Sequence, residues 1–291
     1  MEHKPFDRLL LIGHGSPHSD GNAEYYQFAN ELGTYLGITV QPCFLELAEP
    51  SIVAGIRQCV AEGAQRIAVL PLLLGPAGHQ KSDIPALLDA ARAQYPTRTL
   101  RYGTPIGAHY QLVRVLEERA AATLARSTAA IATAETAVLL VARGSSDPDS
   151  NAEVSKLARL LYEGRGYGTV EVAFQMVTPP TITQGIDRCV RLGARRVVVL
   201  PYVLFTGFVR RKIAEQVQVA QAHHPAVEML MGEHLFPHPG LTEAVAQRYY
   251  DIVNGTAAMT CDLCRYRHPM KRFEQDSRTP HLIPLHSAAS S

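Results

Sequence analysis

The 291-residue sequence contains no tryptophan, has only 7% aromatic residues and shows no excess of either charge. Its formal net charge is +1, so the basic surface typical of nucleic-acid-binding proteins is not expected. No apolar run approaches the roughly 18 residues that a membrane-spanning helix needs, and the charged start MEHKPFDR does not resemble a signal peptide. We therefore expect a cytoplasmic protein that binds neither nucleic acid nor membranes.

Cysteine is also scarce, and several catalytic motifs are missing. The five cysteines are an odd number, which argues against a disulfide framework and for a reducing compartment. Ser16, His14 and Asp20 are close in sequence, as in a nucleophilic hydrolase, but no GxSxG turn orients a serine. No Walker phosphate loop and no GxGxxG after a strand is found. These absences disfavour hydrolases and nucleotide-binding enzymes.

The sequence does contain a regular alternation of strand and helix signals. It opens with the apolar run LLLI, which is typical of a strand buried on both faces and which stops at a histidine between two glycines. Such alternation predicts a parallel sheet with helices on its faces, because parallel neighbours need crossover connections. In the first half we expect strands at 9–12, at 38–45 and at 99–102, and a further strand that ends at Leu74. We expect helices at 23–36 and at 110–124, a helix that begins at Ile52 with Ser51 as its N-cap, and a helix with Pro85 in its first turn and Ser82 or Asp83 as its N-cap.

The pattern then repeats, which indicates a tandem duplication. Residues 51–71 align without a gap with residues 181–201, an offset of 130, and GHGSPHSDGNAE matches ARGSSDPDSNAE at an offset of 129. The Ala/Thr-rich segment STAAIATAET between the halves is interpreted as a linker or frayed helix end. We expect two homologous α/β domains, residues 1–128 and 134–254, each a four-stranded mostly parallel sheet flanked by helices, with a cleft between them.

Three positions at strand ends differ between the halves in a chemically consistent way. His14, Glu46 and His79 in the first half correspond to Arg143, Met176 and Val209 in the second. The carboxyl ends of parallel strands lie on one edge of a sheet, so the first three side chains should converge. Two imidazoles and a carboxylate suit a divalent ion such as Co, Fe, Ni or Zn, although the histidines could instead be general bases. The structural alternative is that Glu46 caps a helix and His79 ends a loop.

These segments resemble the class II tetrapyrrole chelatases of the CbiX type. The resemblance is carried by LLLIGHGSP with His14, by FLELAEPSI with Glu46, by LPLLLGPAGHQKSDIP with His79, and by the duplication, over about residues 8–250. It implies ATP-independent insertion of Co²⁺ or Fe²⁺ into sirohydrochlorin, on the way to cobalamin or siroheme. Cobalt is favoured because the long tandem form resembles the cobalamin branch. A non-catalytic carrier of metal or tetrapyrrole is the alternative.

The resemblance also implies roles for individual residues. His14 and His79 are expected to bind the metal and accept protons, with Glu46 as third ligand or proton relay. The substrate carries many carboxylates, so cations around the cleft should orient it. Either a monomer or a homodimer is compatible with the duplication. The candidate substrate-binding residues are Ser16, Lys81, Arg143, Arg210 and Arg211.

Residues 255–291 form a polar tail without periodicity, which predicts a flexible segment. Its Cys261 and Cys264 make a CxxC motif that fits zinc, a redox dithiol or an iron–sulfur cluster. Some long relatives carry a similar MxCxxC associated with an iron–sulfur centre. Two thiolates are half of the usual four ligands, so a cluster would need a second chain or a ligand such as His268. Cys43, Cys59 and Cys189 are poor supplements because the last two occupy equivalent helix positions and indicate core.

Overall fold

The computed structural model describes residues 6–257, which form two similar α/β halves. The strands are β1 (Arg8–Gly13), β2 (Val40–Phe44), β3 (Arg66–Pro71), β4 (Thr99–Tyr102), β5 (Thr136–Ala142), β6 (Thr169–Phe174), β7 (Arg196–Tyr202) and β8 (Glu228–Met231). The α-helices are α1 (Ser19–Leu36), α2 (Ile52–Ala61), α3 (Ile84–Gln94), α4 (Tyr110–Leu124), α5 (Pro148–Tyr162), α6 (Ile182–Arg191), α7 (Phe208–His223) and α8 (Pro239–Asn254). Two short helical turns are η1 (His79–Asp83) and η2 (Thr133–Glu135).

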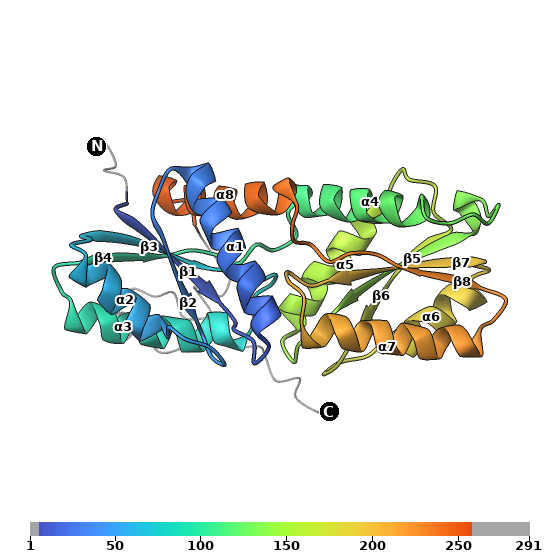
Figure 1. Cartoon of the computed structure of the whole chain (residues 1–291), viewed down its shortest axis with the longest axis horizontal. Coiled ribbons are helices and arrows are strands. Elements are labelled where there is room, and N and C mark those ends of the chain that lie inside the picture. The colour runs from blue at the N-terminus through green and yellow to red at the C-terminus, as the bar shows by residue number, and fades with distance from the viewer. Residues whose placement is uncertain (1–5, 258–291) are drawn as a thin grey trace, which may run out of the picture.

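The strands form two separate four-stranded sheets with the same topology (Figure 1). Their orders are β2-β1-β3-β4 and β6-β5-β7-β8, and each neighbouring pair is parallel. The predicted α/β class and duplicated sheet are therefore confirmed. Within residues 6–257, no helix combines the length and apolarity needed to cross a membrane.

The central strands are buried because helices cover both faces of each sheet. Leu9, Leu10 and Leu11 of β1 are fully buried, as is the run 197–200 of β7. Continuous apolar strands of this kind do not alternate, since no face meets water. The sheets are thus rigid platforms whose strand ends carry the polar side chains.

Some local expectations were right and others were not. Ser51 caps α2 as predicted, because its hydroxyl accepts a hydrogen bond from the Ala54 amide. Strand β3 ends at Pro71 rather than at Leu74. The Ala/Thr-rich linker is held by the buried Arg196, whose guanidinium donates to the carbonyls of Ala129 and Ile131.

The last helix of each half packs on the sheet of the other half. Helix α4 follows β4 of the first sheet but contacts β7, β8 and α5, whereas α8 follows β8 of the second sheet but contacts α1 and β3. Figure 1 shows this exchange, with α8 above the first half and α4 above the second. One continuous core cluster accordingly contains residues of both halves. The exchange makes the two repeats a single packing unit.

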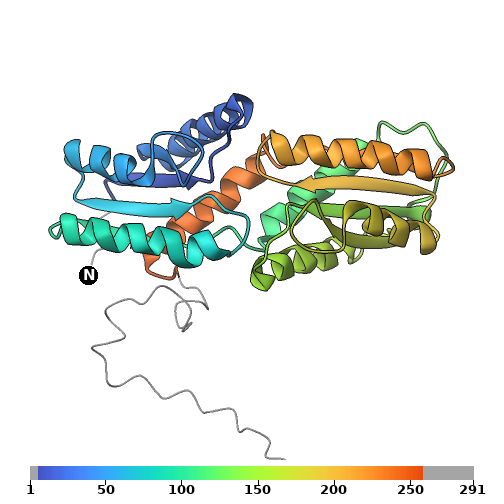
Figure 2. The ribbon, with the colours of Figure 1, turned by 90° about the horizontal axis from the view of Figure 1, so that it is seen from below.

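The carboxyl ends of the two sheets face each other. A Cβ at Gly75, after β3, would contact Ser150 at the start of α5, and a Cβ at Gly21, at the start of α1, would contact Thr206 after β7. Figure 2 shows the strands of the two halves directed toward the centre of the molecule. Side chains placed after strands of either sheet therefore approach the boundary between the halves.

Candidate metal centre

Three polar side chains come together at the carboxyl edge of the first sheet. His14 follows β1, Glu46 follows β2, and His79 begins η1 after β3. The backbone ladder continues past the strands, because the Leu45 amide donates to the Gly13 carbonyl and the Glu46 amide to the His14 carbonyl. The adjacency of β2, β1 and β3 thus places residues that are more than 30 positions apart in sequence at one point.

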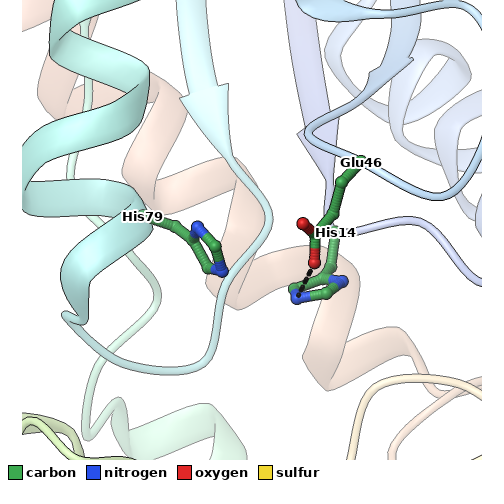
Figure 3. Close-up of side chains that lie close together, drawn as sticks. All are labelled: His14, Glu46 and His79. Carbon is green, nitrogen blue, oxygen red and sulfur yellow. Dashed lines mark ion pairs between the residues drawn. The ribbon is translucent and has the colours of Figure 1, made fainter.

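The geometry of this cluster suits a single ion. One potential ligand atom from each of His14, Glu46 and His79 lies within 4.8 Å of the other two. The two imidazole rings are 5.5 Å apart and nearly perpendicular, and His14 Nε2 lies 3.4 Å from Glu46 Oε1. Figure 3 shows the three side chains pointing toward a common centre from three different segments. The predicted convergence is present in the structure.

The position of His14 depends on a glycine that follows it. Gly15 has φ +92°, and a Cβ there would lie 1.9 Å from the Glu46 carbonyl oxygen. Its counterpart Gly144 has the same φ and would place a Cβ 2.1 Å from the Met176 carbonyl oxygen. Because both halves share this close approach, the glycine serves the loop geometry, and the chemistry resides in the flanking side chains.

His14 presents an unprotonated nitrogen to the cluster. Its Nδ1 lies 3.2 Å from the Gly15 carbonyl oxygen, which can only accept, so Nδ1 carries the hydrogen. Nε2 is buried and has no hydrogen-bond partner. Burial is the main cause of a lowered pKa for His14, and the Arg143 charge lowers it further, against the Gly15 hydrogen bond and the Glu46 carboxylate. The neutral imidazole therefore directs a lone pair at the cluster.

His79 has a carboxylate partner that sequence reasoning assigned to another role. Asp83 was predicted as an alternative N-cap of α3, and it does stand at that position, but its side chain makes no cap hydrogen bond. Its Oδ2 instead lies 2.7 Å from His79 Nδ1. The cap prediction is therefore wrong for Asp83, because the carboxylate turns back toward the preceding turn.

The corresponding edge of the second sheet lacks a ligand set. Arg143, Met176 and Val209 occupy the three equivalent positions. Arg143 is exposed, and its guanidinium makes no hydrogen bond or ion pair with any other residue in the described part of the chain. Its charge nevertheless acts on His14. A free cation therefore lies across the boundary from the three potential ligands.

The other predicted cations already have carboxylate partners. Lys81 Nζ lies 2.7 Å from Asp147 and 2.6 Å from Asp149 of the other half. Arg211 lies 3.2 Å from Asp20, again across the boundary, and Arg210 lies 2.7 Å from Glu233. Lys81 and Arg211 are equivalent by the 130-residue offset, so each half contributes a related cation that makes ion pairs with the other half.

Ser16 belongs to the turn rather than to the ligand cluster. Its hydroxyl accepts from the His18 amide at 3.0 Å, and its amide donates to Asn22. Ser145 makes the equivalent contacts in the second half with Asp147 and Asn151. Repetition in the half without ligands indicates that this serine stabilises the loop. Within residues 6–257, its hydroxyl makes no hydrogen bond with His14, which gives the hydrolase alternative no support.

The cysteines separate into a buried set and the CxxC motif. Cys43, Cys59 and Cys189 are buried. Burial raises the pKa of Cys59 to about 11 and that of Cys189 to about 12, so neither is a ready thiolate ligand. Cys261, Cys264 and His268 lie outside the described residues.

Comparison with known proteins gives consistent matches along both halves. The CbiX family matches residues 8–123 and 137–252. A sirohydrochlorin cobaltochelatase of Priestia megaterium is 39% identical over 261 residues, 89% of this chain and 84% of the relative. A sirohydrochlorin ferrochelatase of the same organism is 32% identical over 249 residues, 85% of this chain and 91% of the relative.

Solved structures give the same result. SirB from Bacillus subtilis with Fe³⁺ superposes with a TM-score of 0.74 at 29% identity, covering 86% of this chain and 96% of that one. The sirohydrochlorin chelatase SirB from Bacillus subtilis subspecies spizizenii in complex with cobalt has a TM-score of 0.71 at 29% identity, covering 85% and 95%. The similarity extends over both sheets and so includes the edge that carries the three potential ligands.

Proposed function

This chain belongs to the CbiX family, and from that membership we infer that it is a metal chelatase that inserts a divalent ion into sirohydrochlorin. The relatives named above for this reaction cover more than four fifths of the chain. We propose that His14, Glu46 and His79 hold the ion before it enters the macrocycle.

One observation in the structure carries the assignment of the metal site. His14 Nε2, with its lone pair, lies 3.4 Å from a carboxylate oxygen of Glu46 that also offers only lone pairs. Two such atoms repel each other unless a cation lies between them, and burial disfavours protonation of the imidazole. A divalent ion bound by both atoms and by His79 relieves that repulsion, and three protein ligands leave coordination positions open for exchange.

We propose cobalt as the physiological ion. Imidazole and carboxylate ligands accept Co²⁺ and Fe²⁺ alike, so the ligand set does not decide between them. The chain is, however, 39% identical to the Priestia megaterium cobaltochelatase and 32% identical to the ferrochelatase of the same organism. A faster reaction with Fe²⁺ than with Co²⁺ at equal concentration would contradict this choice.

The same residues provide what metal insertion requires. The ion must lose water, and two pyrrole N–H protons must leave the macrocycle. His79 would accept one of these protons as it releases the ion. His14 would accept the other, because burial lowers its pKa and keeps the imidazole neutral near neutral pH. Glu46, beside His14, can pass that proton toward solvent, since its side chain is 47% exposed.

Arg143 is the best-supported anchor for a carboxylate of the macrocycle. It is exposed, makes no ion pair among the described residues, and is close enough to His14 to affect its pKa. Lys81, Arg210 and Arg211 could contribute only by exchanging their present carboxylate partners for those of the substrate. We therefore propose Arg143 as the main electrostatic contact.

An anaerobic absorbance time course tests the activity. Purified protein is mixed with sirohydrochlorin and either Co²⁺ or Fe²⁺, alongside the His14→Ala and His79→Ala variants. We expect multiple turnovers above the spontaneous rate in the wild type and loss of turnover in both variants. A spectral change that stops at one equivalent would instead identify a carrier of metal or tetrapyrrole.

We further propose that Cys261 and Cys264 hold an iron–sulfur cluster or second metal, completed by a second chain or by His268. The motif supplies half of the usual ligand number, so a cluster that does not use His268 would have to be shared by two chains. Iron and sulfide content together with light scattering of anaerobically purified protein, compared with a Cys261→Ser, Cys264→Ser double variant, tests both. A monomer without bound metal would exclude the proposal.

A further inference from the structure

Asp83 makes a directed contact with one of the three potential metal ligands. Its Oδ2 lies 2.7 Å from His79 Nδ1, within the single turn η1. An ionised carboxylate only accepts hydrogen bonds, so this contact places the imidazole hydrogen on Nδ1. The lone pair of His79 is then on Nε2. In Figure 3 one ring nitrogen of His79 points toward His14 and Glu46.

The structural roles that an aspartate commonly has at this position are not fulfilled. Asp83 stands at the N-cap of α3, yet its carboxylate accepts no hydrogen bond from the first turn of that helix. Within residues 6–257, the contact with His79 is also its one ion pair. The Asp83 side chain is 54% exposed, so it adds little to the core. What remains is its effect on the ring of His79.

Comparison of the halves points the same way. At the 130-residue offset, His79 corresponds to Val209 and Asp83 to Ile213, which is fully buried. The intervening Lys81 corresponds to Arg211, and both of these make ion pairs between the halves. The second half thus lacks both the imidazole of His79 and the carboxylate of Asp83. The cation that joins the halves is present in both, as Lys81 and as Arg211.

His79 also needs an orienting group more than His14 does. The His14 ring is fixed by its position at the end of the buried strand β1 and by the Gly15 carbonyl. His79 begins a one-turn π-helix, and its side chain is 38% exposed. In the second half the equivalent segment is regular α-helix, within α7. Widened turns of this kind are frequent at functional sites.

We propose that Asp83 is a positioning residue that fixes the tautomer and the direction of His79, so that Nε2 faces a divalent cation held with His14 and Glu46. This inference rests on the proposed metal site. Carboxylates that orient metal-binding histidines typically contribute 10- to 100-fold to metal affinity or activity. Loss of Asp83 lets the ring rotate and lets the hydrogen move to Nε2, which blocks coordination.

The experiment compares Asp83→Ala and Asp83→Asn with a control on the same segment, Asp89→Ala. Asp89 lies on α3 and makes a 2.7 Å ion pair with Arg92, so the control also removes a charged contact within one helix. The asparagine can accept from Nδ1–H or donate to Nδ1, so it permits both tautomers. Long-range ¹H–¹⁵N spectra of the metal-free full chain report the His79 tautomer, and calorimetric titration with Co²⁺ alone at fixed pH reports affinity.

We expect one Nδ1–H tautomer of His79 in the wild type and in Asp89→Ala, and a mixture in Asp83→Ala. Co²⁺ affinity should fall roughly 10- to 100-fold in Asp83→Ala, by less in Asp83→Asn, and not in Asp89→Ala. In turnover assays the apparent KM for Co²⁺ should rise while that for sirohydrochlorin stays unchanged. Unaltered Co²⁺ affinity, or a single retained tautomer, in a folded Asp83→Ala variant would overturn the proposal.

The tests of Asp83 and of the proposed function separate cleanly. The tautomer and the Co²⁺ affinity are measured without sirohydrochlorin. A wild-type protein that binds Co²⁺ without turning over sirohydrochlorin would contradict the chelatase function and leave the result for Asp83 standing. Turnover in the wild type combined with no effect of Asp83→Ala on Co²⁺ binding would contradict the role of Asp83 alone.

Discussion

Replacing Gly15 by alanine should separate the folding role of its loop from the chemical role of the side chains beside it. The position has φ +92°, and the new Cβ would lie 1.9 Å from the Glu46 carbonyl oxygen, where contacts below 3.0 Å essentially never occur. The loop that carries Glu46 must therefore move away by about 1 Å, a displacement that can cost about 100-fold in rate when it misplaces a reacting group.

The second half supplies a matched control. Gly144→Ala meets the same backbone conformation and a similar clash, 2.1 Å from the Met176 carbonyl oxygen, but displaces no ligand. A left-handed conformation at a residue other than glycine costs about 1–3 kcal/mol, which lowers the Tm of a chain of this size by about 2–12 °C. Both variants should lose stability to a similar extent.

Only Gly15→Ala should lose the activity of the ligand cluster. We expect its kcat/KM for cobalt insertion to fall about 100-fold and its Co²⁺ affinity to weaken, whereas Gly144→Ala retains wild-type Co²⁺ affinity. Thermal unfolding, titration with Co²⁺ and steady-state assays below the Tm of both variants measure these effects. Equal loss of Co²⁺ affinity in the two variants would refute the assignment of the chemistry to the first half.

Three further predictions follow from other contacts. Arg143→Ala should raise the KM for sirohydrochlorin about tenfold, as expected for one exposed charged contact, and leave Co²⁺ affinity unchanged; unchanged macrocycle affinity would remove Arg143 as an anchor. Burial lowers the pKa values of His14, His109 and His234, so the unfolded chain binds more protons than the folded one between those lowered pKa values and the ordinary imidazole pKa of about 6.5. The urea concentration at the midpoint of unfolding should therefore fall as the pH drops from about 7 to 5. The variant His109→Gln should show a weaker dependence of this midpoint on pH. A midpoint independent of pH in the wild type would contradict the lowered pKa values of these histidines. Phe28 is fully buried, and its ring contacts Phe205 and Phe236 of the other half. The variant Phe28→Ala should therefore lower the free energy of unfolding of the whole chain by about 3–5 kcal/mol, and calorimetry should show one cooperative transition. Two separable transitions would show that the halves unfold independently.

The convergence of His14, Glu46 and His79 could be predicted because it depends on strand order alone. Each residue lies in the segment that follows a strand of a parallel sheet, so local periodicity together with the internal repeat predicts that the three lie at one edge. The repeat also supplied the comparison with Arg143, Met176 and Val209. The α/β class and the cap at Ser51 could be predicted because each depends on patterns within short segments, and the duplicated sheet because the sequence repeats at an offset of 130 residues.

Contacts made across the repeats could not be predicted in this way. The amphipathic pattern of α4 shows which face is apolar but not which of two similar sheets will cover it. Similarly, Lys81 was predicted only as a candidate substrate-binding residue, and its ion pairs with Asp147 and Asp149 of the other half could not be inferred from the sequence. Asp83 looked like a helix cap, because the direction of its side chain depends on the position of His79. These features arise from three-dimensional proximity that one sequence does not contain.

The exchange of α4 and α8 affects how the two halves are free to diverge. Two separate copies of one repeat that exchanged their last helices would form a symmetric dimer of the same architecture, and every substitution would then appear twice. The connection between α4 and β5 replaces a concentration-dependent association by an intramolecular one. Each half can then accumulate its own substitutions, so one sheet edge keeps two imidazoles and a carboxylate while the other presents an arginine. Covalent linkage of the repeats thus allows a division of labour that identical subunits cannot have.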